Sequence, residues 1–140
     1  MSTAGYSRTP LPRKLGIGDG SRLLLVDAPA DFRATLGQLP PGVELLAPGA
    51  SEVDVVVVFV LELARLRAQF ASLAAALQPA GGLWVAWPKR SSGVATDLTD
   101  NVVREFGLEA GLVDNKVCAI DATWSGLRFV WRLRDRPRRS

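Results

Sequence analysis

The hydrophobic positions of this chain fall into two patterns, short continuous runs and longer amphipathic stretches. Residues 53–60 form an unbroken run of mostly β-branched residues, which is typical of a strand covered on both faces. We expect this strand near the centre of a sheet. In the segment that follows, hydrophobic residues recur every three or four positions from Leu63 to Leu77, which predicts an amphipathic helix.

The same alternation continues on both sides of this pair. Gly81 and Gly82 predict a tight turn before one of the strands, and Gly107 predicts the end of a helix that Thr96 or Asp97 caps. Thr9 predicts the cap of a short helix near the start of the chain. Further strands are expected at 21–27, 43–47 and 83–87, and further helices at 30–36 and 98–106.

The last two apolar stretches, 112–120 and 127–133, are separated by only six residues. No helix fits in that gap, so the two strands are expected to pair antiparallel. The whole pattern predicts an α/β fold, a single Rossmann-like three-layer sandwich with a mostly parallel sheet and an antiparallel C-terminal hairpin. We expect one domain over 1–133, in which 1–20 is an extension with a short helix, and a disordered basic tail over 134–140.

Composition agrees with one ordinary domain. The chain has 140 residues, of which 48% are hydrophobic and 22% charged, values typical of a soluble globular protein with a single core. The most apolar run is too short to cross a bilayer, and the N-terminus has no signal-peptide pattern. We therefore expect a cytoplasmic protein. Cys118 is the only cysteine, which excludes an internal disulfide and predicts a packed core thiol.

The positive net charge of the chain is concentrated at one end. The formal net charge is +3, and residues 132–140 contain five arginines, so the rest of the chain is close to neutral. Such a tail predicts at most weak, salt-sensitive binding to polyanions, and the alternative is a solvated tail. Recognition of nucleic acid by a dedicated surface is not expected.

Several chemistries are excluded by residues that the sequence lacks. It has no histidine, which removes Ser-His-Asp and Cys-His catalysis together with imidazole metal sites. One cysteine without a close cluster of carboxylates excludes a structural zinc site. We therefore predict no catalytic residue and no metal ligand.

The candidate ligand site lies at the carboxyl ends of the strands, where open α/β sheets bind ligands. A basic, hydroxyl-rich loop follows the strand over 83–87 and leads into a helix start, which suits a phosphate or a carboxylate; an ordinary exposed loop is the alternative. Asp27 ends the first strand, as a site acid or as a helix cap. Trp87 and Trp124 are placed to stack on a ligand, or to pack in the core. The candidates are Lys14, Asp27, Trp87, Lys89, Arg90, Ser91, Ser92, Thr96, Asp97 and Trp124.

Four segments resemble a known family. Gly-Tyr-Ser-Arg-Thr-Pro-Leu at 5–11, Leu-Trp-Val-Ala-Trp-Pro-Lys at 83–89, Thr-Asp-Leu-Thr at 96–99 and Thr-Trp-Ser-Gly-Leu at 123–127 are similar to segments of an uncharacterised bacterial family of small single-domain proteins, described only as a domain of unknown function. The resemblance covers nearly the whole chain and implies no activity.

At the level of the fold, the chain also resembles class I methyltransferases that use S-adenosylmethionine. The order of elements, the Pro-Ala-Gly-Gly segment at 79–82 and the closing hairpin carry this resemblance. In that family a glycine-rich turn follows the first strand and approaches the cofactor, whereas this chain has Asp-Ala-Pro-Ala at 27–30, in which the proline lacks an N–H. Compared with that family, the chain lacks a strand-helix unit around 42–53. The departures favour a methyltransferase-like scaffold without a cofactor.

Three functions follow from this reading. The first is a noncatalytic binding or regulatory module for a small anionic ligand or a protein partner. The second is a divergent methyltransferase, in which S-adenosylmethionine would be the cofactor and Asp27 would lie near it. The third is weak polyanion binding through the arginine tail. A homodimer is left open, because an apolar strand edge near the hairpin can pair between chains.

Overall fold

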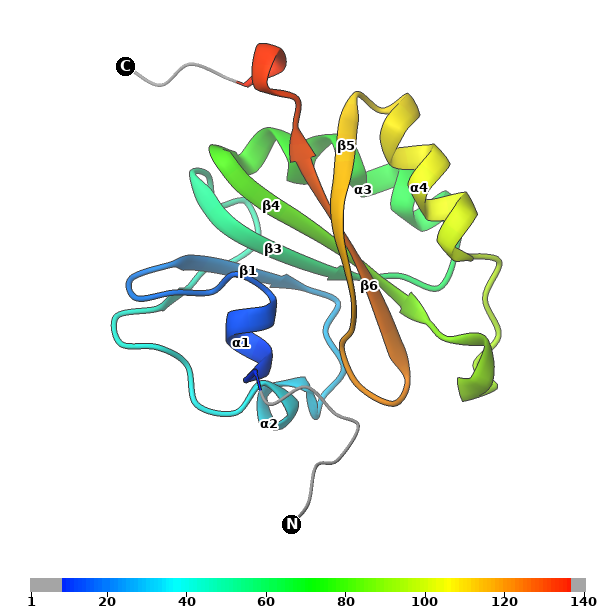
Figure 1. Ribbon diagram of the computed structural model, residues 1–140, viewed down its shortest axis with the longest axis horizontal. Coiled ribbons are helices and arrows are strands. Elements are labelled where there is room, and N and C mark those ends of the chain that lie inside the picture. Colours follow the sequence, from blue (N-terminus) through cyan, green and yellow to red (C-terminus); the bar gives the residue numbers. More distant parts are fainter. Residues whose placement is uncertain (1–8, 137–140) are drawn as a thin grey trace.

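The computed structural model describes residues 9–136, which form one six-stranded sheet with helices on both faces (Figure 1). The strand order is β2-β1-β3-β4-β6-β5. The strands are β1 (Arg22–Val26), β2 (Glu44–Leu45), β3 (Val53–Phe59), β4 (Leu77–Pro88), β5 (Leu112–Ala119) and β6 (Trp124–Trp131). The helices are α1 (Leu11–Lys14), α2 (Phe32–Leu36), α3 (Leu63–Ala76) and α4 (Asp100–Glu109), with 3-10 turns η1 (Arg90–Ser92) and η2 (Leu133–Asp135).

The pairing of the strands confirms the predicted fold class. Strands β2, β1, β3 and β4 are parallel neighbours, whereas β6 runs antiparallel to both β4 and β5. The C-terminal hairpin of β5 and β6 therefore adds two strands to the parallel part of the sheet, and β6 pairs antiparallel with β4. Strand β3 is one of the two middle strands, as its unbroken apolar run predicts.

Alternate residues of the middle strands face two separate hydrophobic clusters. In β3, Val56 and Val58 pack under α3 and α4, while Val55 and Val57 face α1 and α2. Helices α3 and α4 cover one face of the sheet and α1 and α2 the other, as Figure 1 shows. These two layers leave the ends of the strands open to solvent, and two cavities lie there.

Strand β4 corrects the predicted glycine turn. It begins at Leu77, directly after α3, and runs through the Pro-Ala-Gly-Gly segment. The register with β3 shifts between Val53 and Val55, and the β3 backbone comes so close that a Cβ on Gly81 would lie 2.8 Å from the Val53 carbonyl oxygen. Gly81 therefore allows two backbones to approach each other and does not form a turn.

Helix α4 also differs from the prediction. It begins at Asp100, and its cap is Thr99, whose Oγ1 accepts a hydrogen bond of 3.2 Å from the Val102 N–H. Gly107 lies inside the helix and not beyond its end. At the other end of the chain, the N-cap of α1 is Pro10, without a side-chain hydrogen bond, so the predicted Thr9 cap is wrong.

The connection from β2 to β3 contains no helix, as the missing strand-helix unit predicts. The domain boundaries stay predictions. Leu133–Asp135 forms the turn η2 within the predicted tail, whereas residues 1–8, including Gly-Tyr-Ser at 5–7, and residues 137–140 lie outside the described part. Within residues 9–136, no helix has both the length and the apolar content that crossing a membrane requires.

Candidate functional site

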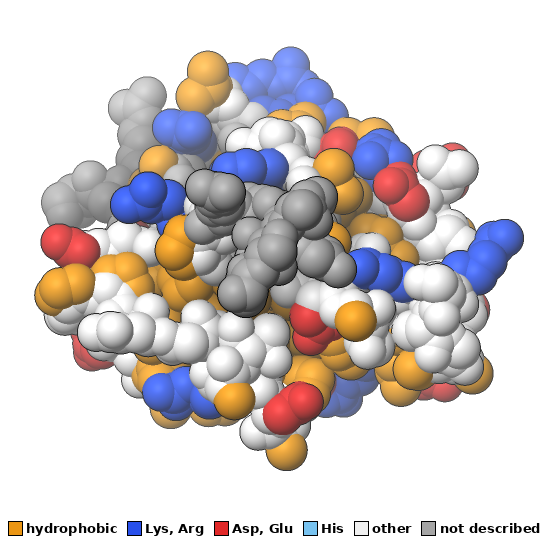
Figure 2. Space-filling model, turned by 60° about the horizontal axis from the view of Figure 1, so that its bottom comes forward, with side chains coloured by type: hydrophobic (Ala, Val, Ile, Leu, Met, Phe, Trp, Pro, Cys, Tyr) orange, Lys and Arg blue, Asp and Glu red, His pale blue; other side chains and the backbone are white. Residues whose placement is uncertain are grey.

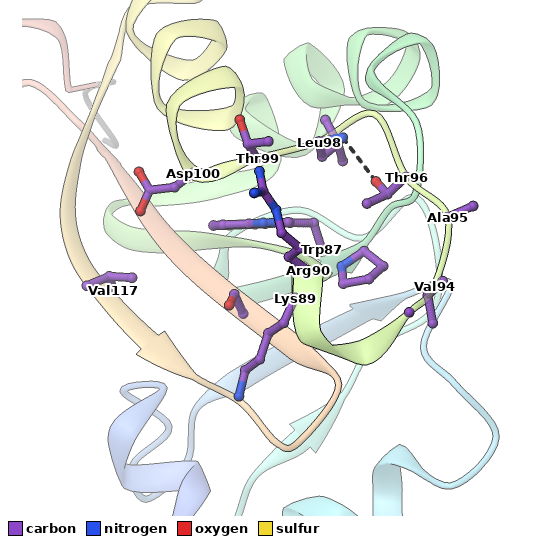
Figure 3. A pocket seen from close by; sticks show the side chains of 13 residues that line it. Trp87, Lys89, Arg90, Val94, Ala95, Thr96, Leu98, Thr99, Asp100 and Val117 are labelled. Atoms are coloured by element: carbon purple, nitrogen blue, oxygen red, sulfur yellow. Dashed lines mark hydrogen bonds between the residues drawn. The ribbon is translucent and has the colours of Figure 1, made fainter.

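A pocket of about 620 Å³ lies at the carboxyl edge of the sheet, at the end of β4 (Figure 3). It lies on the α4 side of the sheet, between the loop over 89–99 and the β5–β6 hairpin. Trp87 belongs to its wall and is only 5% exposed, because its indole also packs in the α3–α4 cluster. The pocket is lined by Trp87, Pro88, Lys89, Arg90, Gly93, Val94, Ala95, Thr96, Leu98, Thr99, Asp100, Val117 and Ser125.

Lys89 and Arg90 supply two positive charges to this pocket. The Lys89 N–H donates a hydrogen bond of 2.7 Å to the Thr123 carbonyl, which fixes the loop to the hairpin. Neither side chain has a hydrogen bond or an ion pair within residues 9–136. In Figure 3 the Arg90 side chain points toward Thr99 and the start of α4. The two cations are therefore available to an anionic ligand.

The predicted serines have different places. Ser92 Oγ donates a hydrogen bond of 2.7 Å to the Lys89 carbonyl and accepts one of 3.2 Å from the Val94 N–H. It shapes the 3-10 turn, and Ser91 is exposed beside it. Neither serine lines the pocket.

Thr96 and Asp97 fasten the loop to the start of α3. Thr96 Oγ1 donates a hydrogen bond to the Leu61 carbonyl, and Asp97 Oδ1 accepts one of 2.9 Å from the Leu63 N–H. Asp97 thus satisfies a free N–H at a helix start 34 residues earlier in the chain. It does not cap α4 as predicted. Of these two residues, only Thr96 lines the pocket.

Lys14 and Trp124 lie away from the pocket. The Trp124 ring packs edge-on against Phe59, with ring centres 5.0 Å apart, on the face that α1 and α2 cover. Lys14 Nζ donates a hydrogen bond of 3.3 Å to the Ala119 carbonyl at the end of β5. The predicted set of residues is therefore divided between the two faces of the sheet.

Asp27 stands at the end of β1, where the sequence predicts a functional acid. Its backbone is in the left-handed region with φ of 56°, and its Oδ2 forms an ion pair of 3.1 Å with Arg65 on α3. The N-cap of α2 is Asp31, so the alternative of Asp27 as that helix cap is wrong. Both partners of the ion pair are about half exposed, which makes the pair weak and open to displacement by a ligand.

The candidates predicted from the sequence lack nine of the residues that line the pocket, among them Thr99, Asp100, Val117 and Ser125. Thr99 and Asp100 have a local signal, since a threonine followed by an acidic first-turn residue is a helix start. Ser125 lies opposite Trp87 in the β4–β6 ladder, and no local pattern predicts that pairing.

Cys118 lies on β5 and is partly buried against the α1–α2 face. Burial raises the pKa of its thiol, and the positive charges of Lys14, Lys116 and Lys89 oppose that shift. The neutral thiol therefore dominates at physiological pH, as a packing role predicts.

Comparison with known proteins identifies the fold. No protein-family profile matches the chain, and no curated protein matches its sequence. Solved structures that match include a SAM-dependent methyltransferase from Aquifex aeolicus (TM-score 0.61, 15% identity, 84% of this chain and 85% of the other). A second is a TehB-like SAM-dependent methyltransferase from Corynebacterium glutamicum (TM-score 0.58, 10% identity, 92% of this chain and 91% of the other). A third is an Aeropyrum pernix fibrillarin with natively bound S-adenosyl-L-methionine (TM-score 0.54, 14% identity, 90% of this chain and 70% of the other).

At these identities the likeness shows the fold alone, which is that of class I SAM-dependent methyltransferases. The likeness contradicts the prediction of a protein without a cofactor, because two of these matching structures are SAM-dependent methyltransferases and the third holds S-adenosyl-L-methionine.

The turn after β1 shows how far the residues present fit that cofactor. It contains Asp27 but no glycine, Pro29 has no N–H, and the Ala28 side chain packs against the α1–α2 cluster. The backbone approach that a glycine-rich turn permits is therefore absent. No methyl-transfer step follows from this turn.

Proposed function

We propose that this protein binds S-adenosylmethionine, or its demethylated product, at the carboxyl edge of a methyltransferase-type sheet, chiefly through the pocket beside Trp87. The observation that carries the proposal is that this pocket contains Lys89 and Arg90, whose side chains have no hydrogen bond or ion pair among residues 9–136, on a fold shared with SAM-dependent methyltransferases. The pocket takes the place of a glycine-rich turn as the main source of binding contacts.

The chemistry of the pocket suits the parts of the ligand. Arg90 would bind its carboxylate through charge-assisted hydrogen bonds. Lys89, whose side chain points away from Arg90 in Figure 3, would add a second positive charge to the lining. Trp87 is only 5% exposed, so it would give the adenine ring a small apolar part of the pocket wall. Asp100, which pairs with Arg104 on the same helix, would attract the ammonium group or, in S-adenosylmethionine, the sulfonium. A volume of about 620 Å³ lies within the ordinary range of small-molecule sites.

A second candidate function is methyl transfer, with the cofactor held at Asp27 and an anionic acceptor in the pocket. The position of Asp27 at the end of β1 and its exposed, displaceable ion pair favour it. Membership of the bacterial family of unknown function and a cytoplasmic location stay predictions and add nothing to this choice.

Isothermal titration with S-adenosylmethionine and S-adenosylhomocysteine tests both. Charge-assisted contacts contribute about 1.5–3 kcal/mol each, so Lys89→Ala with Arg90→Ala should weaken binding by about 10-fold or more. Arg33→Ala with Arg67→Ala, on exposed helix positions that line no described pocket, is the matched control.

The pattern of losses separates the two functions. Weaker ligand binding in the Lys89→Ala, Arg90→Ala variant together with unchanged binding in Asp27→Asn supports binding in the pocket beside Trp87. The reverse pattern moves the cofactor to the β1 turn and leaves the pocket for an acceptor. If neither S-adenosylmethionine nor S-adenosylhomocysteine gives a binding signal with the wild-type protein, both functions are refuted.

A further inference from the structure

A second cavity, of about 350 Å³, opens at the amino end of the sheet, on the α1–α2 face and at the opposite end of β4 from the pocket beside Trp87. It is lined by Gly16, Asp19, Gly20, Ser21, Asp54, Val55, Gln78, Ala80, Gly81 and Arg128. Nothing in the proposed function uses this cavity.

Arg128 is built into the wall of this cavity. It stands opposite Trp84 in the β4–β6 ladder, and its side chain runs across Gly82 so closely that a Cβ there would lie 2.3 Å from Nε. Burial lowers the pKa of this arginine, although the guanidinium stays charged at physiological pH. Its one hydrogen bond within residues 9–136 goes to Asn115 Oδ1, at 3.3 Å.

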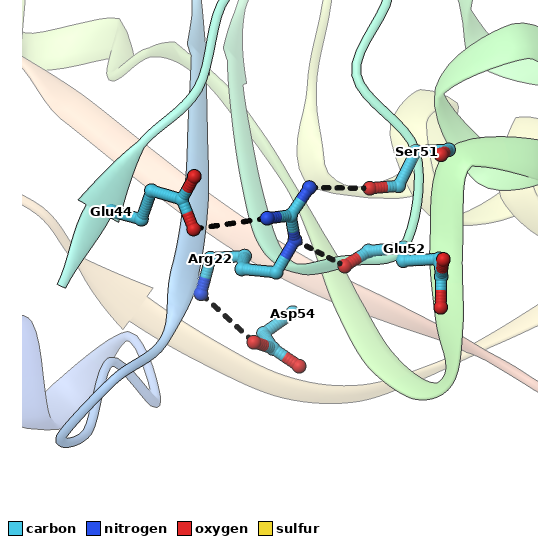
Figure 4. Close-up of polar contacts among 5 residues, drawn as sticks. All are labelled: Arg22, Glu44, Ser51, Glu52 and Asp54. Carbon is cyan, nitrogen blue, oxygen red and sulfur yellow. Dashed lines mark hydrogen bonds and ion pairs between the residues drawn. The ribbon is translucent and has the colours of Figure 1, made fainter. Parts of the chain in front are cut away.

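Arg22, at the same edge of the sheet, has a structural role and serves as a comparison for Arg128 (Figure 4). The Arg22 guanidinium donates to the Ser51 and Glu52 carbonyls and pairs with Glu44 at 2.9 Å. Each of its three nitrogens donates one of these bonds, and together they hold the β2–β3 connection. Arg128 has no carboxylate partner in the described part of the chain, although a partly desolvated charge without one is costly.

Two carboxylates share the cavity with Arg128 without pairing with it. Asp54 Oδ2 accepts a hydrogen bond of 2.8 Å from the Arg22 N–H, whereas Oδ1 has no hydrogen bond or ion pair with described residues. Asp19 is exposed, and neither aspartate forms an ion pair with Arg128. The cavity therefore presents one positive and two negative groups that remain apart.

We infer that this amino-edge cavity is a binding site for a free α-amino acid, whose carboxylate pairs with Arg128 and whose ammonium pairs with Asp54 and Asp19. A plain anion would face two carboxylates, and a plain cation would face the guanidinium, so a small zwitterion matches both signs of charge. The Gln78 amide, which has no described partner, lies in the same wall for a further polar contact.

Titration with the twenty standard L-amino acids, followed by calorimetry, tests this site in the full chain. At least one should bind with a Kd of about 1 mM or tighter. Its N-acetyl derivative, which lacks the ammonium, and its amide, which lacks the carboxylate, should each bind about 10-fold or more weakly. Equal binding of either derivative, or no binding by any amino acid, would overturn the inference.

Variants locate the binding. Arg128→Gln should weaken the best amino acid by about 10-fold or more, with circular dichroism as the check that the protein folds. Asp19→Asn gives a second variant at an exposed position without a structural contact among residues 9–136, and it too should weaken binding. Arg33→Gln is the control. Unchanged affinity for the amino acid in both site variants refutes the site. The proposed function is tested separately, because S-adenosylmethionine binding should depend on Lys89 and Arg90 but not on Arg128.

Discussion

Gly107 has no room for a side chain as small as a methyl group. It lies inside α4, and an added Cβ would be 2.1 Å from the buried ring of Phe129. Alanine favours a helix over glycine by about 1 kcal/mol, but overpacking costs about 1–3 kcal/mol. Gly107→Ala should therefore lower the free energy of unfolding by up to about 2 kcal/mol, measured by urea denaturation.

The control for Gly107 is Gly18→Ala, at an exposed position where nothing lies within 4 Å of the added Cβ. Its free energy of unfolding should change by less than about 0.5 kcal/mol. A stabilised Gly107→Ala protein would show that the Phe129 ring moves aside, and would contradict the close packing of α4 on β6.

Cys118 provides a pH-dependent test at the same scale. Because burial raises the pKa of its thiol, alkylation by iodoacetamide, which requires the thiolate, should have a higher pH midpoint in the folded protein than in the same protein in urea. A folded midpoint at or below the unfolded one would mean that the charges of Lys14, Lys89 and Lys116 outweigh burial.

The same shift has a defined sign for stability. The folded protein holds the thiol proton more tightly than the unfolded chain, so this contribution is complete below the pKa of the unfolded thiol and is lost as the pH rises through the folded pKa. Comparison of Cys118→Ala with the wild type by urea denaturation at alkaline pH should show a smaller decline for the variant.

Helix starts show, at the scale of elements, which contacts the sequence cannot predict. Asp97 binds the Leu63 N–H at the start of α3 at 2.9 Å, whereas Asp31, the N-cap of α2, makes no side-chain cap bond. Asp97→Ala should cost about 1 kcal/mol and speed hydrogen exchange of the Leu63 amide. Asp31→Ala should change stability by only a few tenths of a kcal/mol. Equal losses in the two variants would contradict a specific clamp.

Periodicity predicts the elements of this chain better than their ends. The apolar run over 53–60 and the helical spacing after it correspond closely to β3 and α3. The sequence pattern wrongly predicts a turn at Gly81 and a helix end at Gly107. Both glycines are instead required because β3 packs close to Gly81 and the Phe129 ring close to Gly107, and these neighbours are distant in sequence. Local rules treat glycine as a breaker and do not register a close tertiary contact.

The residues of the candidate site are also predicted only where local sequence determines their place. The loop at Lys89 and Arg90 is found because it continues directly from a predictable strand, and it lines the pocket. Lys14 and Trp124 are assigned to it wrongly, since which face of the sheet a residue occupies depends on strand register. The Arg128 cavity has no local signal, because it joins residues 16 to 128 across three strands.

The charge of the whole molecule is divided between a folded body and its C-terminal end. On the face in Figure 2, basic and acidic side chains are interspersed among hydrophobic ones outside the grey atoms, which does not favour a continuous polyanion surface there. Truncation after Leu133 removes four arginines and one aspartate and lowers the formal net charge from +3 to zero. Because polyanion affinity depends on the number of neutralised charges, the truncated protein should lose retention on a heparin column at low salt.

The thermal midpoint of the truncated protein should stay within a few degrees of the wild type, because the removed residues from Arg134 to Arg136 contribute no buried side chain. Retention that survives truncation would instead assign polyanion binding to lysines of the body. Lys14, Lys89 and Lys116, which all act electrostatically on the Cys118 thiol, form a cluster around that side chain. Lys116→Ala combined with Lys89→Ala in the truncated chain then decides between this cluster and a dispersed charge effect.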